Sequence, residues 1–158
     1  MSFHELWKKY AHDVYRFSLS LCGNPSMAED LTSEAFLRAW VAKDRILALT
    51  VKAYLLSIAR NLYLHEIRKH GRDDAVDPGL PAPGSPVRAA EEREQLRLAL
   101  EGMLLLPEID RAALLLRVQH DLSYEDIGAA LGLPVSTARV KVHRARLRLA
   151  EICQRNLV

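Results

Sequence analysis

Five basic side chains lie within ten residues near the C-terminal end of the 158-residue sequence, and no acidic residue interrupts them. They are Arg139, Lys141, Arg144, Arg146 and Arg148. Arginine can bridge two acceptors of guanine in the major groove, and both residue types neutralise phosphates. The run therefore suits nucleic-acid binding, although a basic helix face that is merely solvated is equally compatible with the run alone.

The residues before this run predict a helix-turn-helix. Ser123 with Asp126 is typical of a helix N-terminus, and Gly132 permits a tight turn after a short helix. The small residues Gly128 and Ala129 are expected to let two short helices approach closely. Turn chemistry beside a basic run favours DNA binding over simple solvation, with the second helix in the major groove.

The second helix is expected to begin at Ser136 or Thr137. Phasing at 100° per residue predicts a buried face made of Ala138, Val142, Ala145 and Leu149. The side chains assigned to bases are Arg139, Val140, His143 and Arg144. Lys141, Arg146 and Arg148 are assigned to the DNA backbone, and Ser136 and Thr137 also belong to the predicted DNA-binding set.

Residues that often perform catalysis show no suitable spacing in this sequence. The histidines at positions 4, 12, 65, 70, 120 and 143 form no metal-type cluster, and no glycine-rich phosphate loop is present. Cys22 and Cys153 lie far apart, which favours reduced thiols in a cytosolic protein. We therefore expect no enzymatic activity, no bound metal and no cofactor.

Composition is that of a globular protein, with 49% hydrophobic residues, 27% charged residues and a formal net charge of +2. No stretch approaches 18 consecutive apolar residues, and the first residues lack a charged segment followed by an apolar one. We expect a cytoplasmic protein without membrane insertion.

The N-terminal half predicts a bundle of three or four helices over residues 3–70. Ser26 with Glu29 suggests a capping box at the start of the second helix, after a break at Gly23. The third helix has apolar residues on two sides, which predicts packing between neighbours. The predicted helices cover residues 3–21, 26–41 and 51–69, and Lys43 to Thr50 is a predicted loop.

Proline, glycine and aspartate punctuate residues 71–92, which predicts a flexible, acidic linker. It divides the chain into a helical domain at 1–70 and a helix-turn-helix domain at 93–158. Helical pattern resumes at about Ala89, and Pro107 is expected to open the helix that carries the core candidates Ala112, Leu115 and Leu116. The predicted fold class is all-α.

Three segments resemble, in the same order, the extracytoplasmic-function (ECF) sigma factors, group 4 of the sigma-70 family. Residues 28–40 (AEDLTSEAFLRAW) resemble the polymerase-binding helix, and residues 54–69 (YLLSIARNLYLHEIRK) resemble the helix used at the minus-ten promoter element. Residues 106–148 are similar to the reader of the minus-thirty-five element. The resemblance implies an RNA polymerase sigma factor with region 2 and region 4 domains, which directs core polymerase to promoters and aids their opening.

The resemblance implies roles for particular residues of the N-terminal half. Glu29, Asp30, Glu34 and Arg38 would contact the clamp coiled coil of the polymerase large subunit, although acids in a first helical turn also favour the helix dipole. Asn61 and Tyr54, with the loop from Lys43 to Thr50, would hold a flipped base of the opened strand. Arg60, Arg68 and Lys69 would hold phosphates. Tyr54 lies on an apolar face and is equally compatible with a core position.

The sequence departs from the family pattern at three places. Tyr54 stands where tryptophan is common, Val140 stands where serine is common, and Thr32-Ser33 stands where a glutamine beside the acids is common. An apolar Val140 suggests contact with a thymine methyl group. Because such factors are commonly restrained by a sequestering partner, we also expect an anti-sigma factor or an equivalent protein.

Two other functions compete with this interpretation. A conventional helix-turn-helix regulator that binds DNA alone as a dimer would explain the C-terminal half, but it leaves residues 28–69 without a purpose. A helical adaptor that binds only protein would leave the basic run without a purpose. Stable binding to core polymerase separates the sigma factor from the first alternative, and promoter-directed transcription separates it from the second.

Overall fold

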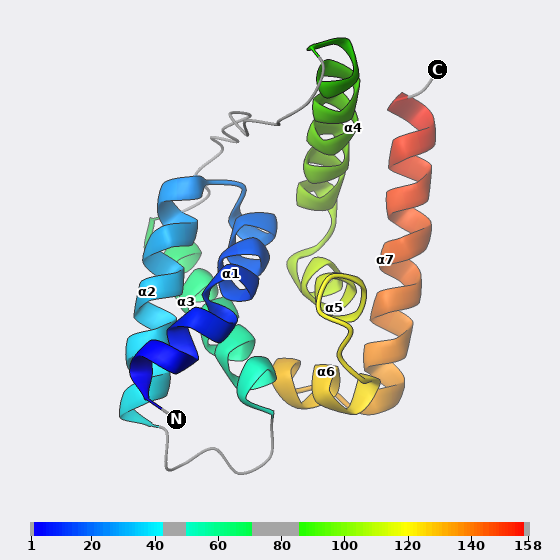
Figure 1. Ribbon diagram of the computed structural model, residues 1–158. Coiled ribbons are helices and arrows are strands. Elements are labelled where there is room, and N and C mark those ends of the chain that lie inside the picture. The colour runs from blue at the N-terminus through cyan, green and yellow to red at the C-terminus, as the bar shows by residue number, and fades with distance from the viewer. Residues whose placement is uncertain (1, 43–49, 71–85, 157–158) are drawn as a thin grey trace.

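The computed structural model describes residues 2–42, 50–70 and 86–156, which form seven helices and no strand. The helices stand as two groups side by side, α1–α3 and α4–α7, which we call the N-terminal and C-terminal domains (Figure 1). The all-α prediction is confirmed. The bounds are α1 Phe3–Cys22, α2 Pro25–Val41, α3 Val51–His70, α4 Pro86–Leu105, α5 Glu108–Val118, α6 Tyr124–Leu131 and α7 Val135–Asn156.

The start of α2 differs from the prediction of a capping box at Ser26. The helix begins at Pro25, and the side chain of Asn24 accepts a hydrogen bond from the Met27 amide at 3.1 Å. Proline fits the first helical position because its missing N–H group needs no partner there. Asn24 therefore caps the helix, and the expected capping box between Ser26 and Glu29 is wrong.

Apolar side chains from all three helices fill the core of the N-terminal domain. Phe17, Leu21, Phe36, Leu55 and Leu56 are fully buried. The two apolar sides of the third helix are explained by its neighbours, because α3 packs on α1 and α2 and also contacts α6 of the C-terminal domain.

The helix α4 begins inside the segment that the sequence predicts as a linker. Helix α4 starts at Pro86, so the last part of the predicted linker 71–92 is helical, and residues 71–85 lie outside the described residues. Pro86 occupies the first helical position, which proline favours. Beyond it, Pro107 stands at the N-terminus of α5 as expected.

The helix-turn-helix consists of α6 and the first turns of α7. Ser123 caps α6 by accepting a hydrogen bond from the Asp126 amide at 3.1 Å, and Gly132 adopts a φ of 69° in the turn. A Cβ atom at Gly128 would lie 2.6 Å from the carbonyl oxygen of Leu133, so the close approach requires glycine there. The similar role expected for Ala129 is wrong, because its side chain is exposed.

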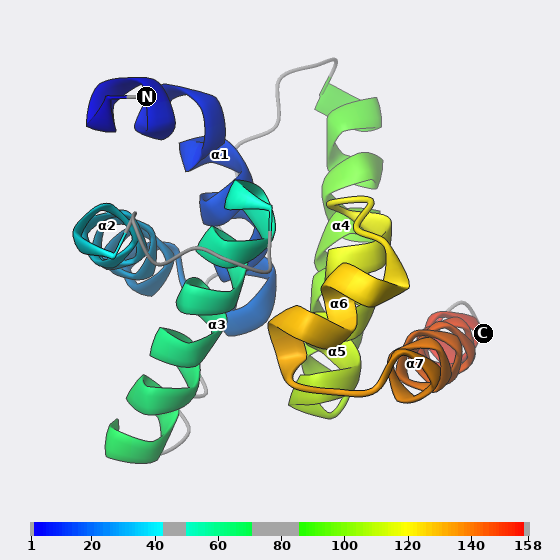
Figure 2. The same cartoon turned by 90° about the horizontal axis from the view of Figure 1, so that it is seen from below.

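The two domains pack on one another through α1, α3 and the helices α4, α5 and α6, as the view from below also shows (Figure 2). The rings of Phe17 and His120 meet edge to face, with 5.6 Å between their centroids. Leu104 of α4 packs over Gly23 at the end of α1. Apolar contacts therefore join the domains into one core.

The buried imidazole of His120 makes stability sensitive to acid. Nε2 lies 2.9 Å from Oε1 of Gln119, while Nδ1 has no hydrogen-bond partner among the described residues. Burial, assisted by the nearby charge of Lys52, lowers the pKa of His120 to about 4. The unfolded chain, with a histidine pKa near 6.5, therefore binds the proton more tightly than the folded chain.

We predict full stability from this source above about pH 6.5, and a loss of up to about 3 kcal/mol as pH falls to about 4. Denaturant unfolding at several pH values, compared with His120→Gln, measures it. The variant should lose this part of the pH slope, whereas His12→Gln, at an exposed position, should keep it. Equal slopes in all three proteins would contradict the prediction.

Candidate nucleic-acid and polymerase interface

The second helix of the helix-turn-helix, α7, presents its charged side away from the core. Ala138, Val142 and Ala145 are buried, as the phasing predicts, and Leu149 is half-buried. The helix begins at Val135, one residue before the expected start. The exposed members of the predicted DNA-binding set are Ser136, Arg139, Val140, His143, Arg144, Arg146 and Arg148, while Thr137 and Lys141 are half-buried.

Arg139 is oriented by an aromatic ring from the preceding helix. Its guanidinium carbon lies 5.2 Å from the ring centroid of Tyr124, and that of Arg117 lies 4.6 Å from the same ring. Arg117 also donates a hydrogen bond to the carbonyl oxygen of Leu122 at 2.9 Å. Cation–π contacts of this kind limit the rotamers of an exposed arginine. Arg139 is therefore held at the surface before any ligand binds.

Two other cations of α7 are held by a buried carboxylate. Asp110 of α5, with only 2% of its side chain exposed, lies 3.2 Å from Nε of Arg144 and 3.6 Å from Nζ of Lys141. A second hydrogen bond joins Nη2 of Arg144 to Oδ1 of Asp110 at 3.4 Å. Asp110 therefore fixes the position of α7 on α5. Arg144, 46% exposed, keeps part of its guanidinium accessible.

A groove between α2 and α3 brings together two sets of predicted residues. Tyr54 and Asn61 of α3 line it on one side, and Glu34 and Arg38 of α2 line it on the other, around a volume of about 700 Å³. Tyr54 is half-buried at the wall of the groove, and Asn61 is exposed. The predicted base-holding and polymerase-binding residues thus share one surface.

The acidic side of α2 continues beyond this groove. Asp30, Glu34 and Arg38 line an adjoining hollow, and Glu29 is exposed on the same helix. Nε of Arg38 donates to Oε1 of Glu34 at 3.0 Å. The remaining part of the predicted base site, the loop from Lys43 to Leu49, lies outside the described residues.

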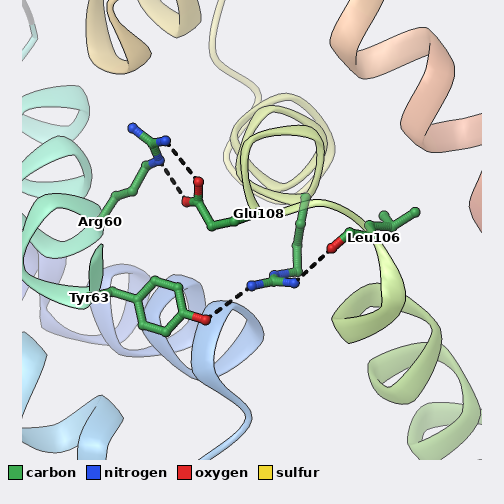
Figure 3. Close-up of polar contacts among 5 residues, drawn as sticks. Arg60, Tyr63, Leu106 and Glu108 are labelled. Atoms are coloured by element: carbon green, nitrogen blue, oxygen red, sulfur yellow. Dashed lines mark hydrogen bonds and ion pairs between the residues drawn. The ribbon is translucent and has the colours of Figure 1, made fainter. Parts of the chain in front are cut away.

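The predicted phosphate ligands of α3 differ in accessibility. Arg68 and Lys69 are exposed in the last turn. Arg60 has 10% of its side chain exposed, and it donates two hydrogen bonds to Glu108 of α5, at 2.7 and 2.8 Å (Figure 3). In this arrangement Arg60 contacts the C-terminal domain and is withheld from an external phosphate.

A second arginine reinforces the same contact. Arg111 of α5 is buried, and it donates to the hydroxyl oxygen of Tyr63 at 3.2 Å and to the carbonyl oxygen of Leu106 at 3.1 Å (Figure 3). Burial raises the pKa of Tyr63, so its hydroxyl remains protonated. Arg111 therefore links the turn before α5 to α3, because it bonds to a carbonyl oxygen of the turn and to the Tyr63 hydroxyl of α3.

Other candidate chemistry is sparse in the described parts of the chain. Within residues 2–42, 50–70 and 86–156, no group of three or more His, Cys, Asp or Glu side chains is placed to hold a metal ion. Over the same ranges, no helix is both long and apolar enough to cross a bilayer. Both cysteines are free, and burial raises the pKa of the Cys22 thiol.

Sequence reasoning does not identify Glu108, Asp110 or Tyr124 as partners of the basic residues. Each contacts a residue on another helix, and separations such as the 34 positions between Asp110 and Arg144 leave no local pattern. The only available signal is that the first turn of a predicted helix carries two acids next to the proline at 107. That signal is also explained by the helix dipole.

Comparison with known families agrees with this geometry. The model of sigma-70 region 2 matches residues 6–73, and the model of sigma-70 region 4 matches residues 94–149. The ECF RNA polymerase sigma factor EcfG of Rhodopseudomonas palustris is 36% identical over 86% of this chain and 76% of its own length. The chain therefore belongs to the ECF RNA polymerase sigma factors of the sigma-70 family, which are non-catalytic transcription initiation factors.

Two further relatives define the extent of the likeness. The ECF RNA polymerase sigma factor SigE of Mycolicibacterium smegmatis is 35% identical over 95% of this chain, which spans 61% of the length of SigE. The sigma factor RpoE of Bartonella quintana, solved with the anti-sigma factor NepR, superposes with a TM-score of 0.78 at 25% identity. That superposition covers 96% of both chains, and so includes both domains.

The Asp110 contact makes an exposed arginine important for stability. We predict that Arg144→Ala lowers the free energy of unfolding by about 1–3 kcal/mol, because it leaves a buried carboxylate with one weak partner. Denaturant unfolding measures the loss. The double variant Asp110→Asn with Arg144→Ala should be more stable than Arg144→Ala alone, since the uncompensated charge is gone. A double variant that is less stable than either single one would contradict the prediction.

Proposed function

We propose that this chain directs core RNA polymerase to promoters by binding the minus-thirty-five element with α7 and the minus-ten element with α3. The observation that carries the proposal is the outward face of α7, where Arg139, Val140 and His143 stand exposed in front of a buried apolar face. This is the arrangement that places side chains on base edges in the major groove.

At the minus-thirty-five element, Arg139 is the principal base-reading side chain. The ring of Tyr124 restricts its conformation, so less entropy is lost when the guanidinium binds guanine. Val140, 57% exposed, offers an apolar surface suited to a thymine methyl group. Arg146 and Arg148 are the proposed phosphate ligands, and Lys141 and Arg144 add positive charge from their positions beside Asp110.

At the minus-ten element, the groove between α2 and α3 is the proposed site of a flipped base. Tyr54 supplies an aromatic wall and Asn61 supplies an amide that can pair with a base edge. Arg68 and Lys69 are exposed at the end of α3 and would neutralise phosphates of the same strand. The core polymerase would bind the adjoining acidic side of α2, made of Glu29, Asp30 and Glu34 with Arg38.

An anti-sigma factor is the proposed regulator of this chain, which would act in the cytoplasm with the polymerase. The relative RpoE was solved with such a partner, and its two domains superpose on those of this chain together. A partner that covers the α2–α3 groove and the α7 face would block polymerase and promoter at once. The chain would then be active when that partner is removed.

We expect Arg139→Ala to weaken binding to a promoter fragment by about 5- to 150-fold, which corresponds to the loss of about 1–3 kcal/mol for one base-contacting arginine. Fluorescence anisotropy with the labelled fragment measures this. Arg97→Ala removes the same charge from α4, where Arg97 is paired with Glu94 and Glu101, and should change the affinity little. Equal losses in the two variants would show that only net charge matters.

In vitro transcription with bacterial core polymerase and fragmented genomic DNA from the source organism tests the whole function. Addition of this chain should produce transcripts with discrete start points. Asn61→Ala should reduce them while leaving binding of closed, double-stranded promoter DNA unchanged, because the flipped base exists only after opening. An absence of transcripts and of co-migration with core polymerase would overturn the proposal.

A further inference from the structure

The contact between Arg60 and Glu108 joins the two domains with two charge-assisted hydrogen bonds of 2.7 and 2.8 Å. Both side chains are mostly buried, with 10% and 20% exposed. Paired bonds from one guanidinium to one carboxylate are stronger and more directional than exposed ion pairs. Figure 3 shows Arg60 and Glu108 paired near Tyr63. Arg111 of α5 donates to the hydroxyl oxygen of Tyr63, so two arginines connect α3 with α5 at neighbouring points.

Further polar contacts lie along the same boundary. Nζ of Lys52 donates to the carbonyl oxygen of His120 at 3.4 Å, and Nε2 of Gln119 donates to Oγ of Ser20 at 3.4 Å. These longer bonds are weaker than the Arg60 pair. Among the described residues, the ion pair is therefore the strongest polar contact between the domains. It uses Arg60, a side chain for which the family resemblance implies a role in holding phosphates.

A carboxylate and a phosphate compete for the same guanidinium. Both offer two oxygens in the geometry that arginine binds with paired hydrogen bonds. Arg60 cannot bind Glu108 and a phosphate in this manner together. Binding of promoter DNA by Arg60 therefore requires that the contact with Glu108 break.

The dimensions of a promoter impose the same requirement. Elements centred about 10 and 35 base pairs before the start point lie about 25 base pairs apart, or about 85 Å along the duplex at about 3.4 Å per pair. A compact chain of this length has a radius of gyration of about 15 Å. Because α3 contacts α6, the helices proposed to bind the two elements, α3 and α7, are too close together to reach both elements at once.

We propose that the Arg60–Glu108 pair is an intramolecular latch that holds the domains closed and withholds Arg60 from nucleic acid until the domains separate. Only the consequence for promoters rests on the proposed function. The closed arrangement of the domains, and the competition between Glu108 and a phosphate for Arg60, are properties of the chain itself. Free chain is closed and binds nucleic-acid backbone weakly through α3. Loss of the Glu108 charge opens the domains and raises that affinity.

The test uses the full chain with two readouts that need neither polymerase nor a known promoter. Small-angle X-ray scattering measures the radius of gyration, and anisotropy of a labelled 20-nucleotide single strand of mixed sequence measures backbone affinity. Glu108→Gln should increase the radius of gyration and strengthen binding about 3- to 10-fold, because a larger fraction of the chain is open. Glu101→Gln, the same charge change at a pair within α4, is the matched control and should alter neither.

Two further variants separate the latch from general effects of charge or misfolding. Arg60→Ala should bind the strand equally weakly with and without Glu108→Gln, because the gain acts through Arg60. The exchange of Arg60→Glu with Glu108→Arg should return the radius of gyration to the wild-type value while binding stays weak. An unchanged radius in Glu108→Gln, or an equal gain in affinity with Arg60 absent, would overturn the latch, whereas failed transcription alone would concern only the proposed function.

Discussion

Helix α5 carries three charged side chains near its start, and burying them requires partners on two other helices. Glu108 binds Arg60 of α3, Asp110 holds Lys141 and Arg144 of α7, and Arg111 bonds to Tyr63 of α3. A buried charge without a partner costs several kcal/mol, so these pairings restrict how the neighbouring helices can sit. The positions of α3 and α7, which carry the two proposed DNA-binding surfaces, are therefore coupled through this single short helix.

This arrangement links the fold to the function of a transcription initiation factor. The acids of α5 pair with basic residues from both domains, and those basic residues belong to the sets predicted to bind nucleic acid. In the free chain, the acids of α5 thus already neutralise some of these basic residues. In the proposed function, promoter phosphates compete with these acids for the basic residues. The salt dependence of DNA binding would then reflect only the basic residues that leave their acidic partners and bind phosphate.

Much of the fold was predictable because its signals are local. The cap at Ser123, the turn at Gly132 and the buried face of α7 follow from neighbouring residues, and the structure confirms them. The cap of α2 was wrongly predicted, since Asn24 and Ser26 are both good capping residues and the choice depends on Pro25. The domain contact was not predicted at all, because a pair such as Arg60 and Glu108 is 48 positions apart and depends on packing.

The same contrast applies to the candidate site. Exposed residues of α7 and the acids of α2 could be selected from helical phase and from the family resemblance. The accessibility of these side chains could not be predicted from the sequence. It differs between residues of the same type, because Arg68 is exposed whereas Arg60 is buried against the other domain. In the proposed function, promoter recognition depends on the separation of the two domains.

The most direct test of this account is the distance between spin labels at the exposed positions Lys8 in α1 and Arg155 in α7, measured with and without core polymerase and promoter DNA. We predict one defined distance in the free chain and an increase of tens of ångströms in the promoter complex, since α3 and α7 must reach elements about 85 Å apart on the duplex. An unchanged distance in a complex that starts transcription would contradict it.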